Sequence, residues 1–199
     1  MSRSRLSFRR QRLGTVFDAA LVQLGWWACV LGAANGFFWA GPLIVALLLA
    51  VQIAGLPAEA RRWAWRSALV AGVLGTAVDS LQSGLGLMTL HGSTVPWLAP
   101  LWITVLWCQF VTVLPAFAAL RSRPLLAGLL GAVGGPLAYG GGVRLGAGSL
   151  HPEPWVSLVS VGVVWALALP LMLRFFLESE ESSERRILTA PVSAKALES

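Results

Sequence analysis

The composition of this 199-residue chain is that of a membrane protein. Hydrophobic residues make up 56% and charged residues 12%, and the mean hydropathy is +0.72, whereas soluble domains are about 45–50% apolar and about 25% charged. The formal net charge of +6 therefore reflects topology and attraction to anionic lipid, not nucleic-acid binding. The short connections between apolar stretches leave no room for a separate soluble catalytic domain.

Six stretches reach the length of about 20 mostly apolar residues that a transmembrane helix needs. They predict an all-α polytopic membrane protein with six transmembrane helices in three antiparallel hairpins and both termini in the cytoplasm. A basic cytoplasmic segment, residues 1–15, precedes the membrane domain, residues 16–177, and a polar tail, residues 178–199, reads as a disordered cytoplasmic extension. The expected spans are about 16–35, 38–55, 67–90, 97–119, 124–146 and 155–177.

The orientation follows from the distribution of cations, because cytoplasmic loops retain Lys and Arg. The expected outer loops, around residues 35–38, 91–96 and 147–154, contain neither residue type. A cleaved signal peptide is the competing interpretation of the first stretch, but its apolar core is longer than the usual 7–15 residues. The cations occur in the N-terminal segment (Arg3, Arg5, Arg9, Arg10, Arg12), the second connection (Arg61, Arg62, Arg66), the fourth connection (Arg121, Arg123) and the tail (Arg174, Arg185, Arg186, Lys195).

The third span carries a small and polar face. Leucines such as Leu74 and Leu81 fall on another face, so we expect Asp79 to point into the bundle. An ionised carboxylate at mid-membrane costs about 2.5–3.5 kcal/mol and needs a partner, a proton or water. Asp79 is either a substrate or ion contact or a neutral hydrogen-bonded acid that serves packing. The face consists of Gly72, Gly75, Thr76, Asp79, Gln82, Ser83 and Gly86.

Two other spans add weaker candidates for a polar site. In the fourth span, Thr104, Cys108 and Thr112 form a stripe at successive i+4 positions, with Gln109 beside it, and Pro115 is expected to end this stripe. Gln23 lies in the first span. Threonine hydroxyls also bond to their own helix, so this stripe is a weak signal. The first span has a small-residue face that is typical of a helix-packing seam, with a binding role as the alternative. That face consists of Gly25, Cys29, Gly32 and Gly36.

The fifth span combines a packing signal with a break signal. Glycines at spacings of three and four, Gly128, Gly131 and Gly135, predict a seam that lets another helix approach closely. Pro136 follows Gly134 and Gly135, which predicts a kink or break, and the stretch from 134 to 142 is expected to be partly unwound. Broken helices are where many transporters bind their substrates.

Such a break would make Tyr139 and Arg144 candidate site residues. Twenty residues of helix place Arg144 about 30 Å from Pro124, at the outer interface. Arg144 either reaches inward to Asp79 or snorkels outward as a headgroup anchor.

The outer loops hold the two histidines of the chain, His91 and His151, together with Glu153. They are weak candidates for a metal site because no HxxxH or HExxH spacing is present. We expect no metal and no cofactor. Leu-His followed by Pro-Trp occurs in both loops, which fits a parallel duplication of hairpins. Chance and interface chemistry are the alternative explanation.

Several motifs resemble a known family. They are QLGWWACVLGAA in the first span, GP at Gly41-Pro42, DSLQSGLGL from Asp79, PLWITVLWCQFVTVL in the fourth span and GAVGGPLAYGGGVRLGA in the fifth. Over about residues 16–177 the chain resembles the bacterial inner-membrane family catalogued as domain of unknown function 2878. The resemblance implies a multi-pass protein with six spans in the bacterial cytoplasmic (inner) membrane and no established activity. It also implies a link to lipid metabolism, since relatives are often encoded near enzymes resembling cyclopropane-fatty-acid synthases.

Two functional hypotheses follow. The first is a transport or binding component for a small solute or a lipid-related molecule, with an interior polar site around Asp79, Gln82, Ser83, Tyr139 and Arg144. The second is a non-enzymatic accessory or scaffold protein for enzymes that modify membrane lipids. An enzyme is less well supported, because no nucleophile with a base and no paired carboxylates are present. The expected partners are the phospholipid bilayer and membrane-lipid enzymes or other membrane subunits, without nucleic acid.

Overall fold

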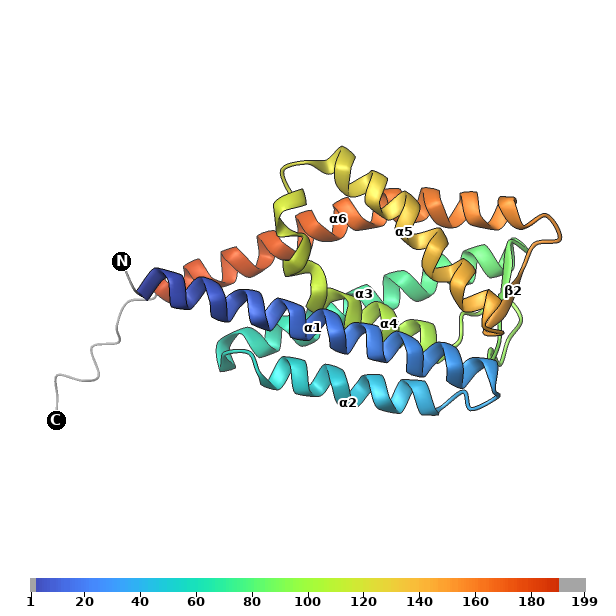
Figure 1. The fold of residues 1–199 in the computed structure, drawn as a ribbon, viewed down its shortest axis with the longest axis horizontal. Helices are drawn as coiled ribbons and strands as arrows, with labels where there is room; N and C mark the ends of the chain where they lie inside the picture. The colour runs from blue at the N-terminus through green and yellow to red at the C-terminus, as the bar shows by residue number, and fades with distance from the viewer. Residues whose placement is uncertain (1–2, 190–199) are drawn as a thin grey trace.

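The computed structural model describes residues 3–189, with side chains over residues 14–176. The chain forms a bundle of helices that run roughly lengthwise (Figure 1). The start of α1 and the end of α6 lie at one end of the bundle, and a small sheet lies at the other. The elements are α1 (Arg3–Ala34), α2 (Ala40–Ala54), α3 (Ala58–Gly84), β1 (Met88–Leu90), α4 (Leu101–Phe110), the 3₁₀ helix η1 (Val111–Leu120), α5 (Pro124–Arg144), β2 (Gly148–Leu150) and α6 (Pro154–Thr189).

Within the described residues, four helical segments are long and apolar enough to cross a membrane: Gly14–Ala34, Leu101–Leu120, Pro124–Arg144 and Pro154–Phe176. The apolar helix α2 has 15 residues, which is shorter than a perpendicular span requires. The helix α3 is long, but it carries three arginines, two carboxylates and the polar face described above. Large apolar side chains such as Leu125 and Leu137 are exposed around the helices. These features indicate a membrane protein.

Helices that follow each other in the sequence pack together: α1 on α2, α3 on α4 and α5 on α6. Glycines allow the close approach in each pair. A Cβ atom added at Gly41 would lie 2.5 Å from the Cα atom of Cys29, and one added at Gly131 would lie 2.1 Å from the carbonyl oxygen of Trp165. Added Cβ atoms at Gly128 and Gly135 would likewise meet Ala166 and Trp165. The predicted packing seams of the first and fifth spans are therefore confirmed.

The prediction of an unwound fifth span is wrong, because α5 is one continuous helix with Pro136 inside it. Pro136 removes a backbone donor to the carbonyl of Ala132. Gly162 of α6 faces that position: its added Cβ atom would lie 3.1 Å from the Ala132 oxygen and 3.4 Å from Cγ of Pro136. The close packing on α6 stabilises the helix where intrinsic propensity alone would not.

The fourth span also differs from the prediction. It begins at Leu101, after Pro100 and not at residue 97, and it changes from an α-helix to a 3₁₀ helix at Val111. The 3₁₀ helix continues to Leu120, close to the predicted end of the span. Pro115 has no N–H to donate to the carbonyl of Val111. The hydroxyl of Thr112 donates to the carbonyl oxygen of Gln109 at 2.8 Å, which satisfies an acceptor at the junction.

The ends of the chain are more helical than expected. The helix α6 continues to Thr189, so the prediction of a disordered tail is wrong for residues 178–189, and residues 190–199 lie outside the described part. At the other end, α1 begins at Arg3 and includes most of the predicted N-terminal segment.

A two-stranded sheet corrects the all-α prediction. The strands β1 and β2 are antiparallel, with Thr89 opposite Ser149. The third span ends at Gly84 and not at residue 90, because Gly86 adopts a φ of 71° and turns the chain toward β1. The helix α5 ends in the same way at Arg144, and Gly146, two residues later, has a φ of 96°. Positive φ values of this size favour glycine.

The sheet relates two similar units, α3–β1–α4 and α5–β2–α6. Thr89 and Ser149, which face each other, have the same sequence separation as Asp79 and Tyr139, 60 positions. The bonds around them repeat as well: His91 N–H donates to the Ala147 carbonyl and His151 N–H donates to the Leu87 carbonyl, both at 3.0 Å. The structure therefore favours duplication as the explanation of the repeated motif.

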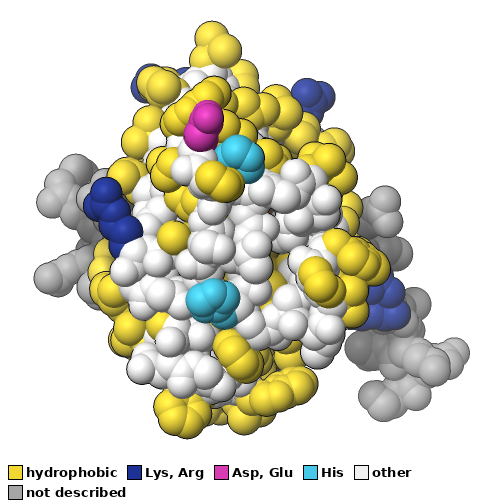
Figure 2. All heavy atoms as spheres, turned by 90° about the vertical axis from the view of Figure 1, so that its right-hand side faces the viewer, with side chains coloured by type: hydrophobic (Ala, Val, Ile, Leu, Met, Phe, Trp, Pro, Cys, Tyr) yellow, Lys and Arg dark blue, Asp and Glu magenta, His cyan; other side chains and the backbone are white. Residues whose placement is uncertain are grey.

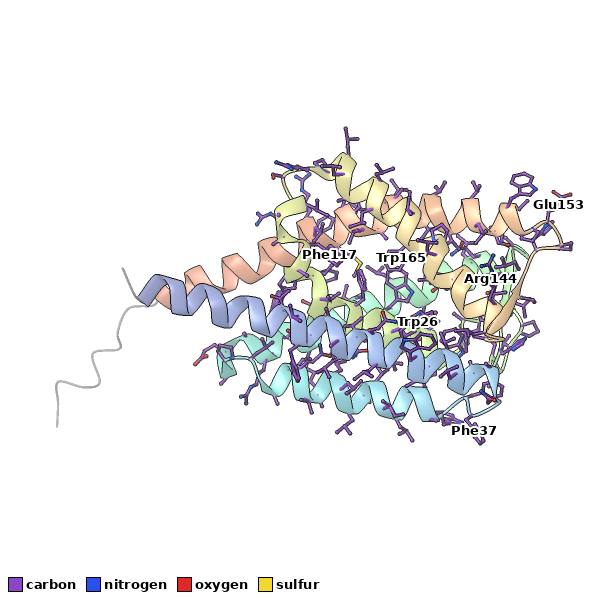
Figure 3. All side chains as sticks on the ribbon, viewed as in Figure 1. Trp26, Phe37, Phe117, Arg144, Glu153 and Trp165 are labelled. Atoms are coloured by element: carbon purple, nitrogen blue, oxygen red, sulfur yellow. The ribbon has the colours of Figure 1, made fainter. Side chains whose placement is uncertain are left out.

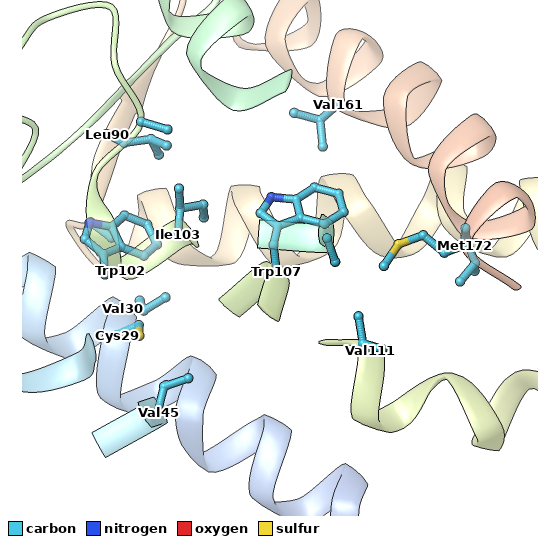
Figure 4. Close-up of a cluster of buried hydrophobic side chains, with 14 of the residues drawn as sticks. Cys29, Val30, Val45, Leu90, Trp102, Ile103, Trp107, Val111, Val161 and Met172 are labelled. Carbon is cyan, nitrogen blue, oxygen red and sulfur yellow. The ribbon is translucent and has the colours of Figure 1, made fainter. Parts of the chain in front are cut away.

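The core lies where the two units meet. Figure 4 shows Trp107 at the centre of a cluster of buried apolar side chains, with Val161 and Met172 on one side and Ile103 and Val30 on the other. These side chains come from α1, α4 and α6, so the cluster joins the first hairpin to the duplicated units.

Candidate functional site

Asp79 is fully buried and accepts hydrogen bonds from three neutral groups. Trp107 Nε1–H donates to its Oδ2 at 2.7 Å, the Tyr139 hydroxyl donates to the same oxygen at 2.8 Å, and Gln82 Nε2 donates to Oδ1 at 3.2 Å. The Ser160 hydroxyl in turn donates to Gln82 Oε1 at 3.0 Å. The prediction that Asp79 points inward is confirmed. The network joins α3, α4, α5 and α6.

Arg144 takes no part in this network. It lies exposed in the last turn of α5, at the sheet end of the bundle (Figure 3), whereas the Asp79 carboxylate is 0% exposed. The inward interpretation of Arg144 is therefore wrong. The Ser83 side chain is half-buried, and its carbonyl oxygen accepts the N–H of Gly86 in the turn after α3.

Two stacked tryptophans connect the Asp79 network of the first unit, α3–β1–α4, to the second unit, α5–β2–α6. The indole rings of Trp107 and Trp165 lie 4.7 Å apart and are nearly parallel, with an interplanar angle of 12°. Each ring covers a glycine of the preceding helix, Gly75 under Trp107 and Gly135 under Trp165. In the first unit Trp107 donates to Asp79, whereas in the second Nε1 of Trp165 is buried without an acceptor. Tyr139, which occupies the position equivalent to Asp79, donates instead to Asp79 itself.

A second polar cluster joins α1, α2 and the α4–η1 junction. Gln52 Nε2 donates to Asp18 Oδ1 at 3.0 Å and to Thr112 Oγ1 at 2.8 Å. Gln109, which is fully buried, donates to Gln52 Oε1 at 3.2 Å and to the carbonyl of Leu21 at 3.1 Å. Its own Oε1 has no partner and lies 2.2 Å from a Cβ atom added at Gly25. Gln109 therefore serves helix packing.

Thr104 also serves packing. Its hydroxyl is hydrogen-bonded to the hydroxyl of Thr76 at 2.6 Å, and Thr76 donates to the carbonyl of Gly72 at 2.7 Å. The pair lies at the contact of α3 with α4, where Gly72 also faces Cys108.

An apolar cavity lies beside the Asp79 network, not around it. It has a volume of about 340 Å³ and lies between α1, α4, η1, α5 and α6. Of the predicted site residues, Tyr139 and Gln23 line it, and Asp79, Gln82, Ser83, Thr104, Gln109 and Arg144 do not. Most of the wall is aromatic or aliphatic, and none of the described residues that line it is charged. Besides Tyr139, the aromatic side chains are Trp26, Trp102, Trp107, Phe110, Phe117 and Trp165.

The cavity opens between α1 and α5. Gln23 on α1 and Leu130, Gly134 and Ala138 on α5 line it and are exposed, whereas the opposite wall, which includes Trp107, is buried. The two helices approach each other at the sheet end, where an added Cβ atom at Gly141 would lie 3.8 Å from Trp26. They diverge toward the end where α5 begins (Figure 1). Figure 3 shows Trp26, Phe117 and Trp165 around this space.

The two histidines lie on the sheet end of the bundle (Figure 2). His91 Nδ1 is hydrogen-bonded to the Gly146 carbonyl at 2.9 Å, and His151 Nδ1 accepts the N–H of Glu153 at 3.1 Å. Within the described residues, no three His, Cys, Asp or Glu side chains come together as metal ligands would. Both histidines thus support the turns at the sheet end of the bundle.

Sequence reasoning missed several of these residues. Asp18 could have been found by the rule that singled out Asp79, because it is an ionisable residue inside an apolar span. Gln52 and Ser160 gave no spacing signal. The aromatic wall was hidden, since its side chains come from α1, α4, η1 and α6 and no spacing within a single helix marks them.

Comparison with known proteins assigns the chain to a family but assigns no activity to it. No curated protein and no solved structure matches it. Residues 15–171 match the family model described as protein of unknown function (DUF2878), and the chain belongs to that family.

Proposed function

We propose that this protein binds an apolar or amphiphilic molecule that enters its cavity from the lipid phase. The observation that carries the proposal is the position of the opening, between α1 and α5, at the middle of two segments that can span a membrane. A side opening at this depth faces hydrocarbon, so the ligand is one that dissolves in lipid. The cavity volume of about 340 Å³ lies within the usual range of ligand pockets.

The wall supports an apolar ligand and not a small polar solute. Two of the indole N–H groups at the wall are already bonded to protein acceptors, Trp102 to the carbonyl of His91 and Trp107 to Asp79. The Tyr139 hydroxyl also donates to Asp79. An aromatic surface whose polar groups are mostly satisfied favours an acyl chain or another flat or flexible hydrocarbon.

The shape of α5 contributes to the opening. Gly131 and Gly135 face α6 and permit close packing there, whereas Gly134 faces open space, with nothing within 4 Å of an added Cβ atom. A side chain at position 134 would therefore occupy the mouth without a clash. This makes Gly134→Leu a specific way to narrow the opening.

The test uses methyl stearate brominated at mid-chain, at low mole fraction in nanodiscs, because bromine quenches the fluorescence of nearby tryptophans. We expect quenching that saturates with probe in the natural protein and weakens severalfold in Gly134→Leu. The matched control is Gly14→Leu, since Gly14 also lies in a helix with open space around it but does not line the cavity. Quenching that rises linearly with probe and is equal in all three proteins would refute the proposal.

We also propose that the chain crosses a bacterial cytoplasmic membrane six times, with both ends in the cytoplasm. The arginines on one side of the predicted topology and the proximity of the ends of α1 and α6 (Figure 1) support this arrangement. The variants Thr94→Cys, in the loop before α4, and Ser122→Cys, before α5, test it. A membrane-impermeant maleimide added to intact cells should label the first and not the second, and the reverse pattern would contradict the orientation.

The accessory function for membrane-lipid enzymes remains the second expectation. It requires a reproducible enzyme partner in affinity purification from native membranes, together with probe quenching that Gly134→Leu leaves unchanged. The two proposals therefore give opposite results with the same variant.

A further inference from the structure

The side chain of Gln23 is a polar group in an apolar place. It lies nine residues after Gly14, so about 14 Å along the first candidate span, near the middle of a hydrocarbon core about 30 Å thick. It is exposed at the mouth of the cavity, and no hydrogen bond joins it to another residue in the described part of the chain. An amide without a partner in hydrocarbon is costly, since neither lipid tails nor water satisfy it at this depth.

The other polar groups of the wall cannot take this role as readily. The hydroxyl of Tyr139 and the indole N–H groups of Trp102 and Trp107 already donate to protein oxygens, and Nε1 of Trp165 is fully covered. The Trp26 indole, one turn from Gln23, also has no acceptor in the described chain. Gln23 alone offers both donors and an acceptor at the opening.

The absence of charge along the described wall narrows the ligand further. A phosphate or carboxylate inside the cavity would lack a cation, and burying an unpaired charge is much more costly than burying a neutral oxygen. The ester and headgroup oxygens of an ordinary phospholipid lie at the membrane surface, about 15 Å from this depth. The matching group is therefore a neutral oxygen within the hydrocarbon part of the ligand.

Building on the proposed function, we propose that Gln23 is the residue that selects the ligand, and that the ligand is a neutral lipid with a carbonyl or hydroxyl oxygen at mid-bilayer depth. The side-chain amide of Gln23 donates to that oxygen, and a hydroxyl ligand can donate back to its Oε1. The hydrocarbon on either side of the oxygen lies against the aromatic wall. The site thus distinguishes an oxygenated chain from a plain one.

The test measures displacement of the brominated probe by three competitors: methyl stearate, its analogue with one ketone at mid-chain, and its analogue with the ketone beside the ester. We expect the mid-chain ketone to bind about fivefold more tightly than methyl stearate, the effect of one net hydrogen bond. The analogue with the ketone beside the ester should bind like methyl stearate. In Gln23→Leu the ratio between the affinities of the mid-chain ketone and methyl stearate should fall to about one.

A swapped variant, Gln23→Leu with Leu24→Gln, is the matched control. It keeps the composition of α1 but moves the amide to Leu24, which is exposed and does not line the cavity. It should behave like Gln23→Leu, and a retained preference for the ketone would overturn the proposal. A preference that persists in Gln23→Leu and is lost in Trp26→Phe would also overturn it, by assigning the oxygen to the indole.

The outcomes separate this inference from the proposed function. If methyl stearate does not compete at all, the cavity is not a lipid site and the proposed function fails. If methyl stearate and both ketones compete equally in the natural protein, the cavity binds lipid and only the role of Gln23 fails. If Gln23→Leu also converts an oligomer to a monomer, the amide joins two copies of the chain, which would likewise overturn the inference.

Discussion

The hydrogen bonds around Asp79 predict how strongly a substitution at this position lowers the stability of the protein. In Asp79→Asn an NH₂ group replaces one carboxylate oxygen. If it takes the position of Oδ1, the Gln82 amide can turn over so that Oε1 accepts from it and Nε2 donates to the Ser160 oxygen. The remaining oxygen still accepts from Trp107 and Tyr139. Every group keeps a partner, so we expect a loss of less than about 1.5 kcal/mol, from the weaker bonds of a neutral acceptor.

Asp79→Leu should lower the free energy of unfolding far more than Asp79→Asn. The N–H of Trp107 cannot turn away because the ring is held between Gly75 and Trp165, and the Tyr139 hydroxyl is left without its acceptor. Two buried donors without partners cost about 1–3 kcal/mol each. A loss of about 2–6 kcal/mol is a large part of a typical stability of about 5–15 kcal/mol.

A thiol-reactive fluorogenic dye measures this difference in detergent. Cys29 is buried and unpaired, so its labelling on heating reports unfolding. From the middle of the range for Asp79→Leu, a loss of about 4 kcal/mol against at most about 1.5 kcal/mol for Asp79→Asn leaves a difference of about 2.5 kcal/mol. At about 2–4 °C per kcal/mol, we expect Asp79→Leu to unfold about 5–10 °C below Asp79→Asn. Equal midpoints for the two variants would refute the reasoning, because the network would then require the charge itself or contribute nothing.

Three further predictions concern glycines and Arg144. Gly131→Ala should lower the unfolding midpoint by several degrees, because its Cβ atom would lie 2.1 Å from the Trp165 carbonyl oxygen. Gly134→Ala should leave the midpoint unchanged or raise it, since alanine favours a helix over glycine by up to about 1 kcal/mol; the reverse order of the two midpoints would contradict the packing of α5 on α6. Gly146→Ala should cost about 1–2 kcal/mol in the same labelling assay, since a φ of 96° is unfavourable for alanine; no loss would mean that this turn is formed differently. Arg144→Gln should leave the midpoint within about 0.5 kcal/mol of the natural value, because an exposed side chain at a helix end contributes little; a loss as large as that of Asp79→Leu would restore a link to Asp79.

The helices and the inward position of Asp79 followed from the sequence because they rest on local patterns. Apolar length indicates a span, and spacing by three and four places Asp79 and Gln82 on one face. The seam at Gly131 and Gly135 was predictable for the same reason, since small residues at this spacing form a groove in any straight helix.

The continuity of α5 could not be predicted in this way. Pro136 and its neighbouring glycines disfavour a helix locally, and the stabilising contact is with Gly162 on α6, a residue distant in sequence. The two strands were missed because β1 and β2 pair across the duplicated units, and Thr89 and Ser149 show no strand pattern in such short segments.

The predicted site and the cavity differ in position: the prediction was centred on Asp79, and the cavity lies beside the Asp79 network. The cost of a carboxylate in lipid drew attention to Asp79, but three neutral donors satisfy it and exclude it from the cavity. Gln23 was a minor candidate in the sequence, and its exposure at the cavity mouth depends on the divergence of α1 and α5, which no local pattern encodes.

Photo-crosslinking from α5 in native membranes tests the lipid-accessible cavity most directly. Benzoylphenylalanine replaces Leu130, which lines the mouth, or the adjacent Leu129, which is exposed but does not line it, and mass spectrometry identifies the adducts. We predict that position 130 captures a neutral lipid enriched far above its share of the membrane, while position 129 captures phospholipids in bulk proportion. Bulk phospholipid at both positions would contradict a selective site in this cavity.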